Sequence, residues 1–116
     1  MHQYKELKVW QKAMSITKLT YQLCAGFPDN ERYGLVSQMR RAAVSLPSNV
    51  AEGAGRNSKP EFRQFLAIAN GSAYELETQF LLAASFGYVS EENLNTISSQ
   101  LTELQKMLFG LQKSLT

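Results

Sequence analysis

The side chains of this sequence that could do chemistry gather in the stretch RRAAVSLPSNVAEGAGR, residues 40 to 56. Arg41, Ser45, Asn49, Glu52 and Arg56 follow one another at spacings of four, four, three and four, which places them on one face of a helix. An amide beside a carboxylate could do acid–base chemistry if burial tuned the pKa of the carboxylate. Alternatively, these groups are the hydrogen-bonded polar residues of a helix packed too closely for larger side chains.

The side chains that usually complete an active site are missing. His2 is the only histidine and Cys24 is the only cysteine, so the sequence offers no Cys/His pair and no cluster of metal ligands. Gly53-Ala54-Gly55 is not a phosphate loop, because no strand precedes it and the Walker pattern is missing. We therefore expect no enzymatic activity, no cofactor, no metal and no small-molecule substrate.

Basic side chains are the other candidates for function, because the planar guanidinium of arginine donates two parallel hydrogen bonds to phosphate. The net charge of +2 is small, but six basic and two acidic residues lie between Arg32 and Arg63, whereas every charge from Glu75 to Glu103 is negative. We predict one basic patch for nucleic-acid binding, made by Arg40, Arg41, Arg56, Lys59 and Arg63. Alternatively, internal carboxylates neutralise Arg40 and Arg41, and the other three residues lie in a solvated turn.

Apolar residues at steps of three and four predict that helices position these side chains. The first helix is expected from about residue 4 to 25 and the second from about 31 to 54. The third begins at the capping box of Ser58 and runs for about 28 residues to the stop at Gly87, and the fourth follows the N-cap Ser90. Four long helices with short loops predict an all-α, antiparallel up-down four-helix bundle, with residues 1–116 as a single domain.

Two of the predicted helices carry clear apolar seams. These are Phe62, Leu66, Ala69, Ala73, Leu76, Phe80 and Ala83 in the third helix, and Leu94, Ile97, Leu101, Leu104, Leu108, Leu111 and Leu115 in the fourth. Pro47 falls inside the second helix, where it removes a backbone hydrogen bond. We expect one helix kinked at Pro47 that ends at a left-handed Gly55, with Ser45 and Ser48 beside the freed carbonyls. The alternative is a second helix capped by Asn49, which would have only about one turn.

The second and third helices share a short turn, so their side chains can be paired outward from it. This pairing places Ser45 near Ile68 and Arg41 near Ser72 or Glu75. The hairpin also needs partners for its polar groups. We predict a structural polar network of Ser45, Asn49, Glu52, Glu75 and Glu77, in which Arg40 or Arg41 pairs with Glu75.

The N-terminal residues MHQYKELKVW lack the continuous apolar region of a signal peptide. No apolar run approaches the roughly 18 residues of a membrane span. A single cysteine cannot form an internal disulfide and fits a reducing compartment. The expectation is a soluble cytoplasmic protein without a membrane partner.

The stretch from Phe27 to Phe80 resembles the signature of the four-helix-bundle proteins linked to 23S rRNA intervening sequences. The matching residues are Phe27, Pro28, Glu31, Gly34, Leu35, Gln38, Arg40, Arg41, Ser45, Asn49, Val50, Ala51, Glu52 and Gly53, followed by Phe62, Phe65, Ala69, Gly71, Ser72, Glu75, Leu76 and Glu77. The opening LKVWQKA also fits the first helix of that family, so the resemblance covers nearly the whole chain. Pro47 departs slightly from the family pattern, and this departure affects only the prediction of a kink.

The resemblance implies a bacterial cytoplasmic protein, sometimes encoded inside an intervening sequence of the large-subunit rRNA gene. It also implies a ring-like homopentamer. The family is similar to the accessory variability determinant of diversity-generating retroelements, a basic pentamer that works with a reverse transcriptase and nucleic acid. No enzymatic activity is attached to the family, and its biochemical role is poorly defined.

Two functions are consistent with these observations. The first is a non-enzymatic homo-oligomer, pentameric by resemblance, that binds structured RNA or DNA through a basic face. The alternative is a protein–protein interaction or assembly scaffold with no nucleic-acid role. The heptad seam of the fourth helix and the two apolar stripes of the first helix support self-association in both cases.

Overall fold

The computed structural model describes residues 3–116; Met1 and His2, and with them the expectation for the only histidine, lie outside the described residues. Four α-helices dominate this part of the chain: α1 (Lys8–Cys24), α2 (Leu35–Ala54), α3 (Lys59–Ser85) and α4 (Glu91–Ser114). Two short 3₁₀ helices, η1 (Tyr4–Glu6) and η2 (Asp29–Glu31), precede α1 and α2, so these two helices begin a few residues later than the sequence predicts. No strand occurs within residues 3–116.

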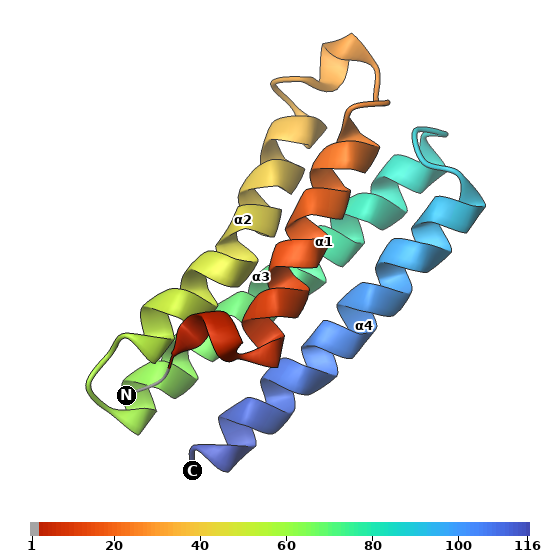
Figure 1. The fold of residues 1–116 in the computed structure, drawn as a ribbon. Helices are drawn as coiled ribbons and strands as arrows, with labels where there is room; N and C mark the ends of the chain where they lie inside the picture. Colours follow the sequence, from red (N-terminus) through yellow and green to blue (C-terminus); the bar gives the residue numbers. More distant parts are fainter. Residues whose placement is uncertain (1–2) are drawn as a thin grey trace.

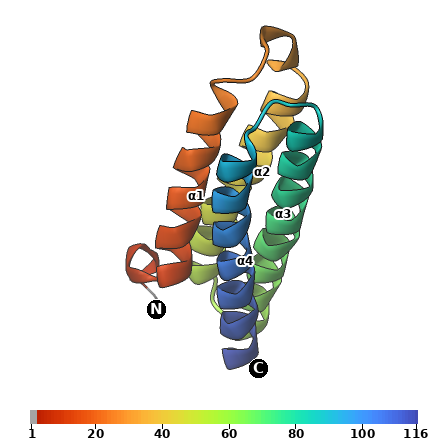
Figure 2. The same cartoon turned by 90° about the vertical axis from the view of Figure 1, so that its right-hand side faces the viewer.

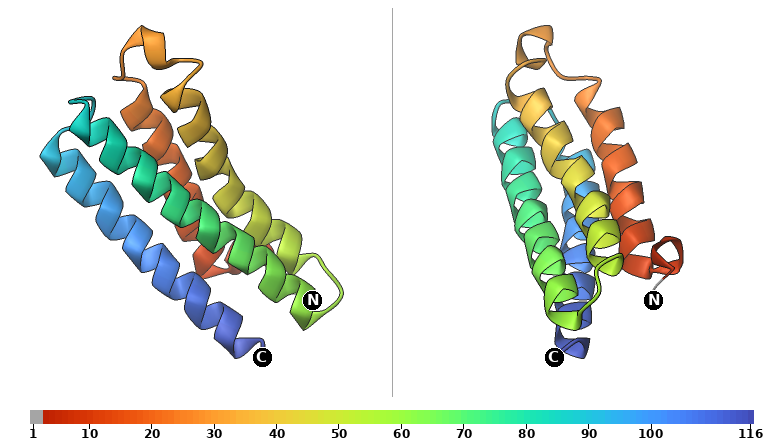
Figure 3. Two further views of the ribbon diagram at one scale, coloured as in Figure 1. Left: turned by 180° about the vertical axis from the view of Figure 1, so that it is seen from behind. Right: turned by 90° about the vertical axis from the view of Figure 1, so that its left-hand side faces the viewer.

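The four helices form the predicted antiparallel bundle. Each loop reverses the chain, so that α1 and α3 run in one direction and α2 and α4 in the other (Figures 1 and 2). Each helix packs against the next one in the sequence, and α1 also packs against α4, which closes the ring of four (Figure 3). The resulting rod is 43 Å long and 24 × 20 Å across. No helix within residues 3–116 is long and apolar enough to cross a membrane.

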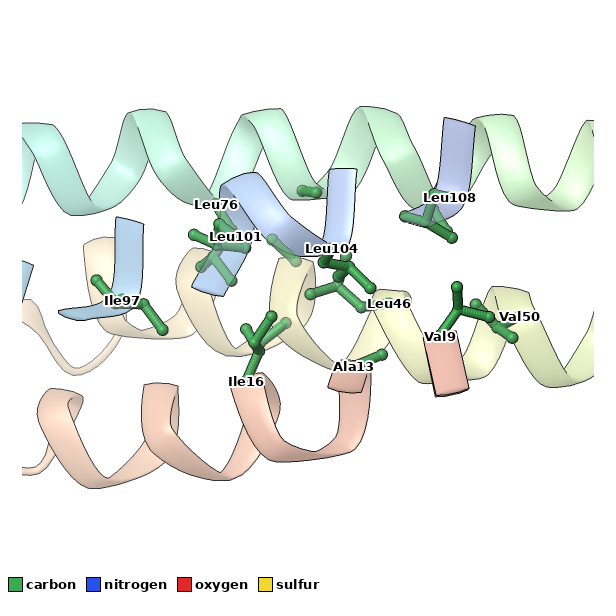
Figure 4. Packing of buried hydrophobic residues seen from close by; sticks show 14 of the residues in the cluster. Val9, Ala13, Ile16, Leu46, Val50, Leu76, Ile97, Leu101, Leu104 and Leu108 are labelled. Atoms are coloured by element: carbon green, nitrogen blue, oxygen red, sulfur yellow. The ribbon is translucent and has the colours of Figure 1, made fainter. Parts of the chain in front are cut away.

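The core is made by the seams that the sequence predicts. All seven residues of the α3 seam are buried, and the α4 seam is buried from Ile97 to Leu108 and partly buried at Leu94 and Leu111. Ile97, Leu101, Leu104 and Leu108 of α4 meet Leu76 of α3, Leu46 and Val50 of α2, and Val9, Ala13 and Ile16 of α1 along the axis of the bundle (Figure 4). Steps of three and four residues keep such a stripe on one face of a helix, which is why the pattern could be found in the sequence.

The helix ends confirm three predictions and contradict one. The hydroxyl oxygens of Ser58 and Ser90 accept hydrogen bonds from the backbone N–H of Glu61 and Asn93, as N-caps do. Gly87 has φ of 82° and ends α3 in the left-handed conformation. The prediction of a left-handed Gly55 is wrong: its φ is −84°, because the chain leaves α2 through a further right-handed turn closed by Arg56 N–H and the Gly53 carbonyl.

Helix α2 continues through Pro47 without a break, so the alternative of a restart at Asn49 is wrong. The kink at Pro47 stays a prediction. The carbonyl of Ala43, which loses its helical partner to the proline, lies 2.8 Å from the hydroxyl of Thr17 on α1. The hydrogen bond that Pro47 removes is therefore replaced from a neighbouring helix, and not by Ser45 or Ser48 as the sequence suggests.

The register between α2 and α3 differs from the predicted one by about one turn. Ser45 meets Ser72, with 2.7 Å between the hydroxyl oxygens, and not Ile68. Near the loop, a Cβ atom built on Gly53 would lie 2.7 Å from Cβ of Phe65. The first turn of α3 therefore extends beyond the end of α2, a displacement that pairing residues symmetrically about the loop does not anticipate.

Candidate nucleic-acid interface

The polar residues of the α2–α3 hairpin include one hydrogen-bonded chain between the helices. Asn49 donates from Nδ2 to the carbonyl and to the hydroxyl oxygen of Ser45, at 2.8 Å in both cases. The Ser45 hydroxyl in turn contacts the Ser72 hydroxyl on α3. All three side chains are partly buried, and small residues let the helices approach closely here. Ser45 and Asn49 thus have the structural contacts that the sequence predicts, with Ser72 as the partner it did not include.

The three carboxylates assigned to the same network lie elsewhere. Glu52 pairs with Arg56, four residues later and just beyond the end of α2, with 3.1 Å between Oε2 and Nη2. Glu75 accepts a long hydrogen bond of 3.5 Å from Gln79 within α3. Glu77 accepts a hydrogen bond of 3.2 Å from Gln105 on α4. The predicted single network is therefore wrong, because Glu75 and Glu77 are two residues apart on α3 and so point to different sides of the helix.

The predicted ion pair between Glu75 and Arg40 or Arg41 is also wrong. Within residues 3–116, ion pairs of 4.0 Å or less join only Lys12 to Glu103 and Arg56 to Glu52. No carboxylate of the described chain therefore neutralises the two arginines at close range, which removes the alternative that internal ion pairs engage them both.

Arg40 is half-buried and points toward α1. Its guanidinium carbon lies 4.8 Å from the ring centroid of Tyr21, which is a cation–π contact. The Nε–H of Arg40 is buried and has no hydrogen-bond acceptor in the described chain. A buried donor almost always has an acceptor in a folded protein, so Arg40 is an exception that calls for a reason.

Arg41 is exposed and points to the other side of α2, toward α3. It lines a hollow of about 480 Å³ together with Ser45, Ser72 and Glu75. The guanidinium of Arg41 and the carboxylate of Glu75 therefore face the same open space, although they lie more than 4.0 Å apart. This hollow is polar and open to solvent, which leaves Arg41 accessible to a large ligand.

The other three basic candidates lie near the α2–α3 loop. Arg56 forms the ion pair with Glu52 and also lies over the Phe65 ring, at 4.8 Å from its centroid. Arg63 donates from Nη1 to the carbonyl oxygen of Leu115, so it caps the C-terminal end of α4. Lys59 is exposed in the first turn of α3 and makes no ion pair within the described chain.

The five basic residues thus form two groups and not one patch. Arg40 is fourteen residues before Ala54, the last residue of α2, which corresponds to roughly 21 Å at the rise of an α-helix, and Arg56 lies beyond that end. Arg40 and Arg41 themselves face opposite neighbours, α1 and α3. The prediction of a single cluster is wrong because a run of basic residues in sequence is spread along and around a long helix.

Several residues of this region had no part in the predicted site. The Thr17 hydroxyl donates a hydrogen bond to the Ala43 carbonyl, and the Tyr21 ring makes a cation–π contact with the Arg40 guanidinium. Glu31, the last residue of η2, accepts hydrogen bonds from the Leu35 N–H at 3.2 Å and from the Tyr88 hydroxyl at 3.0 Å. This second hydrogen bond raises the pKa of Tyr88. A hydroxyl on the apolar stripe of α1, opposite a proline in a helix, is the one signal that could have indicated Thr17.

Metal binding has no structural support in this region. Within residues 3–116, no three His, Cys, Asp or Glu side chains lie close enough together to hold a metal ion.

Known proteins resemble this chain in sequence and in fold. A crystal structure of a protein with unknown function from the S23 ribosomal protein family of Bacteroides thetaiotaomicron VPI-5482 superposes with a TM-score of 0.84. It is 24% identical, and the match covers 90% of this chain and 95% of that one, so this likeness shows the fold alone. No curated protein shows significant similarity to the chain. Residues 5–110 match the family described as 23S rRNA-intervening sequence protein. The chain therefore belongs to the 23S rRNA-intervening sequence protein family.

Proposed function

We propose that this protein is a non-enzymatic homo-oligomer of the cytoplasm that binds structured RNA or other nucleic acid through its basic residues. The observation that carries the proposal is that Arg41 and Lys59 are exposed and form no ion pair within residues 3–116. Exposed cations without a carboxylate partner attract phosphate, and release of counterions from nucleic acid drives such binding.

Self-association is supported by the outward face of α3. Ile68, Tyr74, Leu81 and Leu82 are 46%, 56%, 53% and 47% exposed, although α3 already buries a complete apolar seam on its other side. Ala67 and Gly71 are exposed as well, and between Ala67 and Leu82 the one exposed charged side chain is Glu75. A helix that is apolar on more than its core-facing side is typical of a protein–protein contact.

Repetition of the chain strengthens weak phosphate contacts. The family resemblance implies five copies, and each copy contributes its own Arg41 and Lys59. Linked sites bind a long polyanion with an avidity well above the affinity of a single site. An extended RNA that spans neighbouring subunits fits this arrangement better than a short oligonucleotide.

The experiment that tests the proposal measures RNA binding by the assembled protein over a series of salt concentrations. Binding should weaken steeply as salt rises, and the double variant Arg41→Gln, Lys59→Gln should bind less tightly with a smaller salt slope. Lys18→Gln is the matched control, because Lys18 is exposed on α1 outside both basic groups. Absence of binding by the oligomer at low ionic strength contradicts the proposal.

The second candidate function is an assembly scaffold without a nucleic-acid role. The exposed apolar residues of α3 favour it, since they serve self-association whether or not RNA is bound. Only the assembly-scaffold function predicts an oligomer that does not bind RNA at low salt.

A further inference from the structure

A small hollow lies where the end of α1, the following loop and the first turns of α2 meet. It has a volume of about 140 Å³, and Cys24, Asp29, Arg32 and Arg40 are among the residues that line it. Cys24 is the last residue of α1, whereas Arg40 lies in α2, so these side chains meet because the chain folds back between the two helices. The hollow is distinct from the larger one beside Arg41.

Two guanidinium groups face this hollow without a close acid. Arg40 is held over the Tyr21 ring, and its buried Nε–H has no acceptor in the described chain. No carboxylate within residues 3–116 lies within 4.0 Å of the nitrogens of Arg40 or Arg32. The positive charge of Arg40 is also close enough to act on the Cys24 thiol at the wall of the hollow. Half-buried positive charge that lacks a partner is favourable for an anion.

The neighbouring carboxylates determine which anion fits. Glu31 is engaged by the Leu35 N–H and the Tyr88 hydroxyl. Asp29 lines the hollow beside the two arginines. A carboxylate repels a fully ionised anion but accepts a hydrogen bond from one that carries a proton. The hollow thus combines donors for oxygen atoms with one acceptor for an O–H group.

We propose that this hollow binds a phosphate group that carries a proton, as in hydrogen phosphate or the monoanion of a phosphate monoester. Arg40 and Arg32 donate to the phosphate oxygens, and Asp29 accepts from the P–OH. Sulfate has the same shape but no proton at neutral pH, and a phosphodiester has no P–OH, so both lack the group that Asp29 needs.

The size of the hollow agrees with a phosphate group alone. Its volume equals about five times the share of one liquid water molecule, which leaves no space for a base and a ribose. A nucleotide could place only its terminal phosphate there. This inference does not depend on the proposed function, because phosphate can bind here whether or not the oligomer binds RNA.

The experiment follows the Nε–H resonance of Arg40 by NMR as inorganic phosphate is added to the full-length protein. The expected result is a saturable shift at constant ionic strength, with sulfate binding at least tenfold more weakly. Arg32→Gln, in the exposed loop, should weaken phosphate binding about tenfold, while Arg41→Gln on the opposite side of α2 should leave it unchanged. Asp29→Asn should remove the preference for phosphate over sulfate.

Two further ligands distinguish the possible sources of the phosphate. At about pH 6, where a nucleoside 5′-monophosphate is partly the protonated monoanion, it should shift the same resonance, whereas a dinucleotide without a terminal phosphate should not. A shift that is linear in concentration, that chloride reproduces, or that persists unchanged in Arg32→Gln would overturn the inference. Equal affinity for sulfate and phosphate would overturn the role of Asp29.

Discussion

The Thr17 hydroxyl lies 2.8 Å from the carbonyl oxygen of Ala43, the carbonyl that Pro47 leaves without its helical N–H. The same hydroxyl lies 2.9 Å from the Ala13 carbonyl within α1, so its single proton serves one of two acceptors at a time. Helix α1 thereby supplies the hydrogen bond that makes a proline tolerable in the middle of α2.

Replacing Thr17 tests this relationship. Thr17→Val keeps the shape of the side chain but leaves the buried Ala43 carbonyl unsatisfied, which should cost about 1–3 kcal/mol of unfolding free energy. In a Pro47→Ala background the helix regains its own N–H donor, so the same substitution should cost less. Chemical denaturation of the four proteins measures the coupling between the two positions. Equal costs in both backgrounds would show that Thr17 does not compensate for Pro47.

The close approach of α2 and α3 depends on Gly53. A methyl group at this position would lie 2.7 Å from Cβ of Phe65 and 3.0 Å from Cδ1 of Phe62, so Gly53→Ala should destabilise the fold by about 1–3 kcal/mol. Gly110→Ala is the matched control, because nothing lies within 4 Å of the added carbon in α4. The control should stabilise the protein by up to about 1 kcal/mol through helix propensity. Thermal unfolding checks both, and a stabilised Gly53→Ala variant is incompatible with the described packing.

The Cys24 thiol links stability to alkaline pH. Burial raises the pKa of this thiol from 9.0 to about 11, against the opposing charge of Arg40. The unfolded chain therefore ionises Cys24 at lower pH than the folded protein does. The resulting stabilisation is complete below about pH 9 and is lost as the pH rises to about 11, with an upper limit of ~3 kcal/mol.

Urea denaturation at several pH values checks this prediction. The unfolding free energy of the wild type should fall more steeply between about pH 9 and 11 than that of Cys24→Ala, which has no thiol to ionise. The two proteins share every other titrating group, so the difference between them isolates Cys24. Parallel curves would mean that the thiol ionises equally in the folded and unfolded chains.

The exposed apolar residues of α3 predict where copies of the chain meet. Ile68→Asp places a charge on this face and should convert the proposed oligomer to monomers. The isolated bundle should remain folded, because Ile68 is 46% exposed and contributes little to the core. Ser99→Asp, an exposed position on α4, adds the same charge elsewhere and should leave assembly intact. Sedimentation velocity distinguishes these outcomes, and an unchanged oligomer of Ile68→Asp excludes this face as the contact.

The periodicity of apolar residues made the four-helix bundle predictable from the sequence. The contacts between the helices could not be predicted in this way. The seams of α3 and α4 and the caps at Ser58 and Ser90 depend on neighbours within a few residues, which the sequence displays directly. The register of Ser45 with Ser72 depends on how far α3 extends past the end of α2, which no local pattern encodes. Ion pairing was predicted least well, because Arg40 and Arg41 are adjacent in sequence but face different helices.

The measurement that tests the proposed function most directly is the mass of the purified protein before and after nuclease treatment. Native mass spectrometry of the untreated sample should show an oligomer with bound nucleic acid, and nuclease should remove the added mass and leave the oligomer of protein alone. A pentamer is the number that the family resemblance implies. A monomer, or an oligomer that neither carries nucleic acid nor takes up added RNA at low salt, would contradict the proposal.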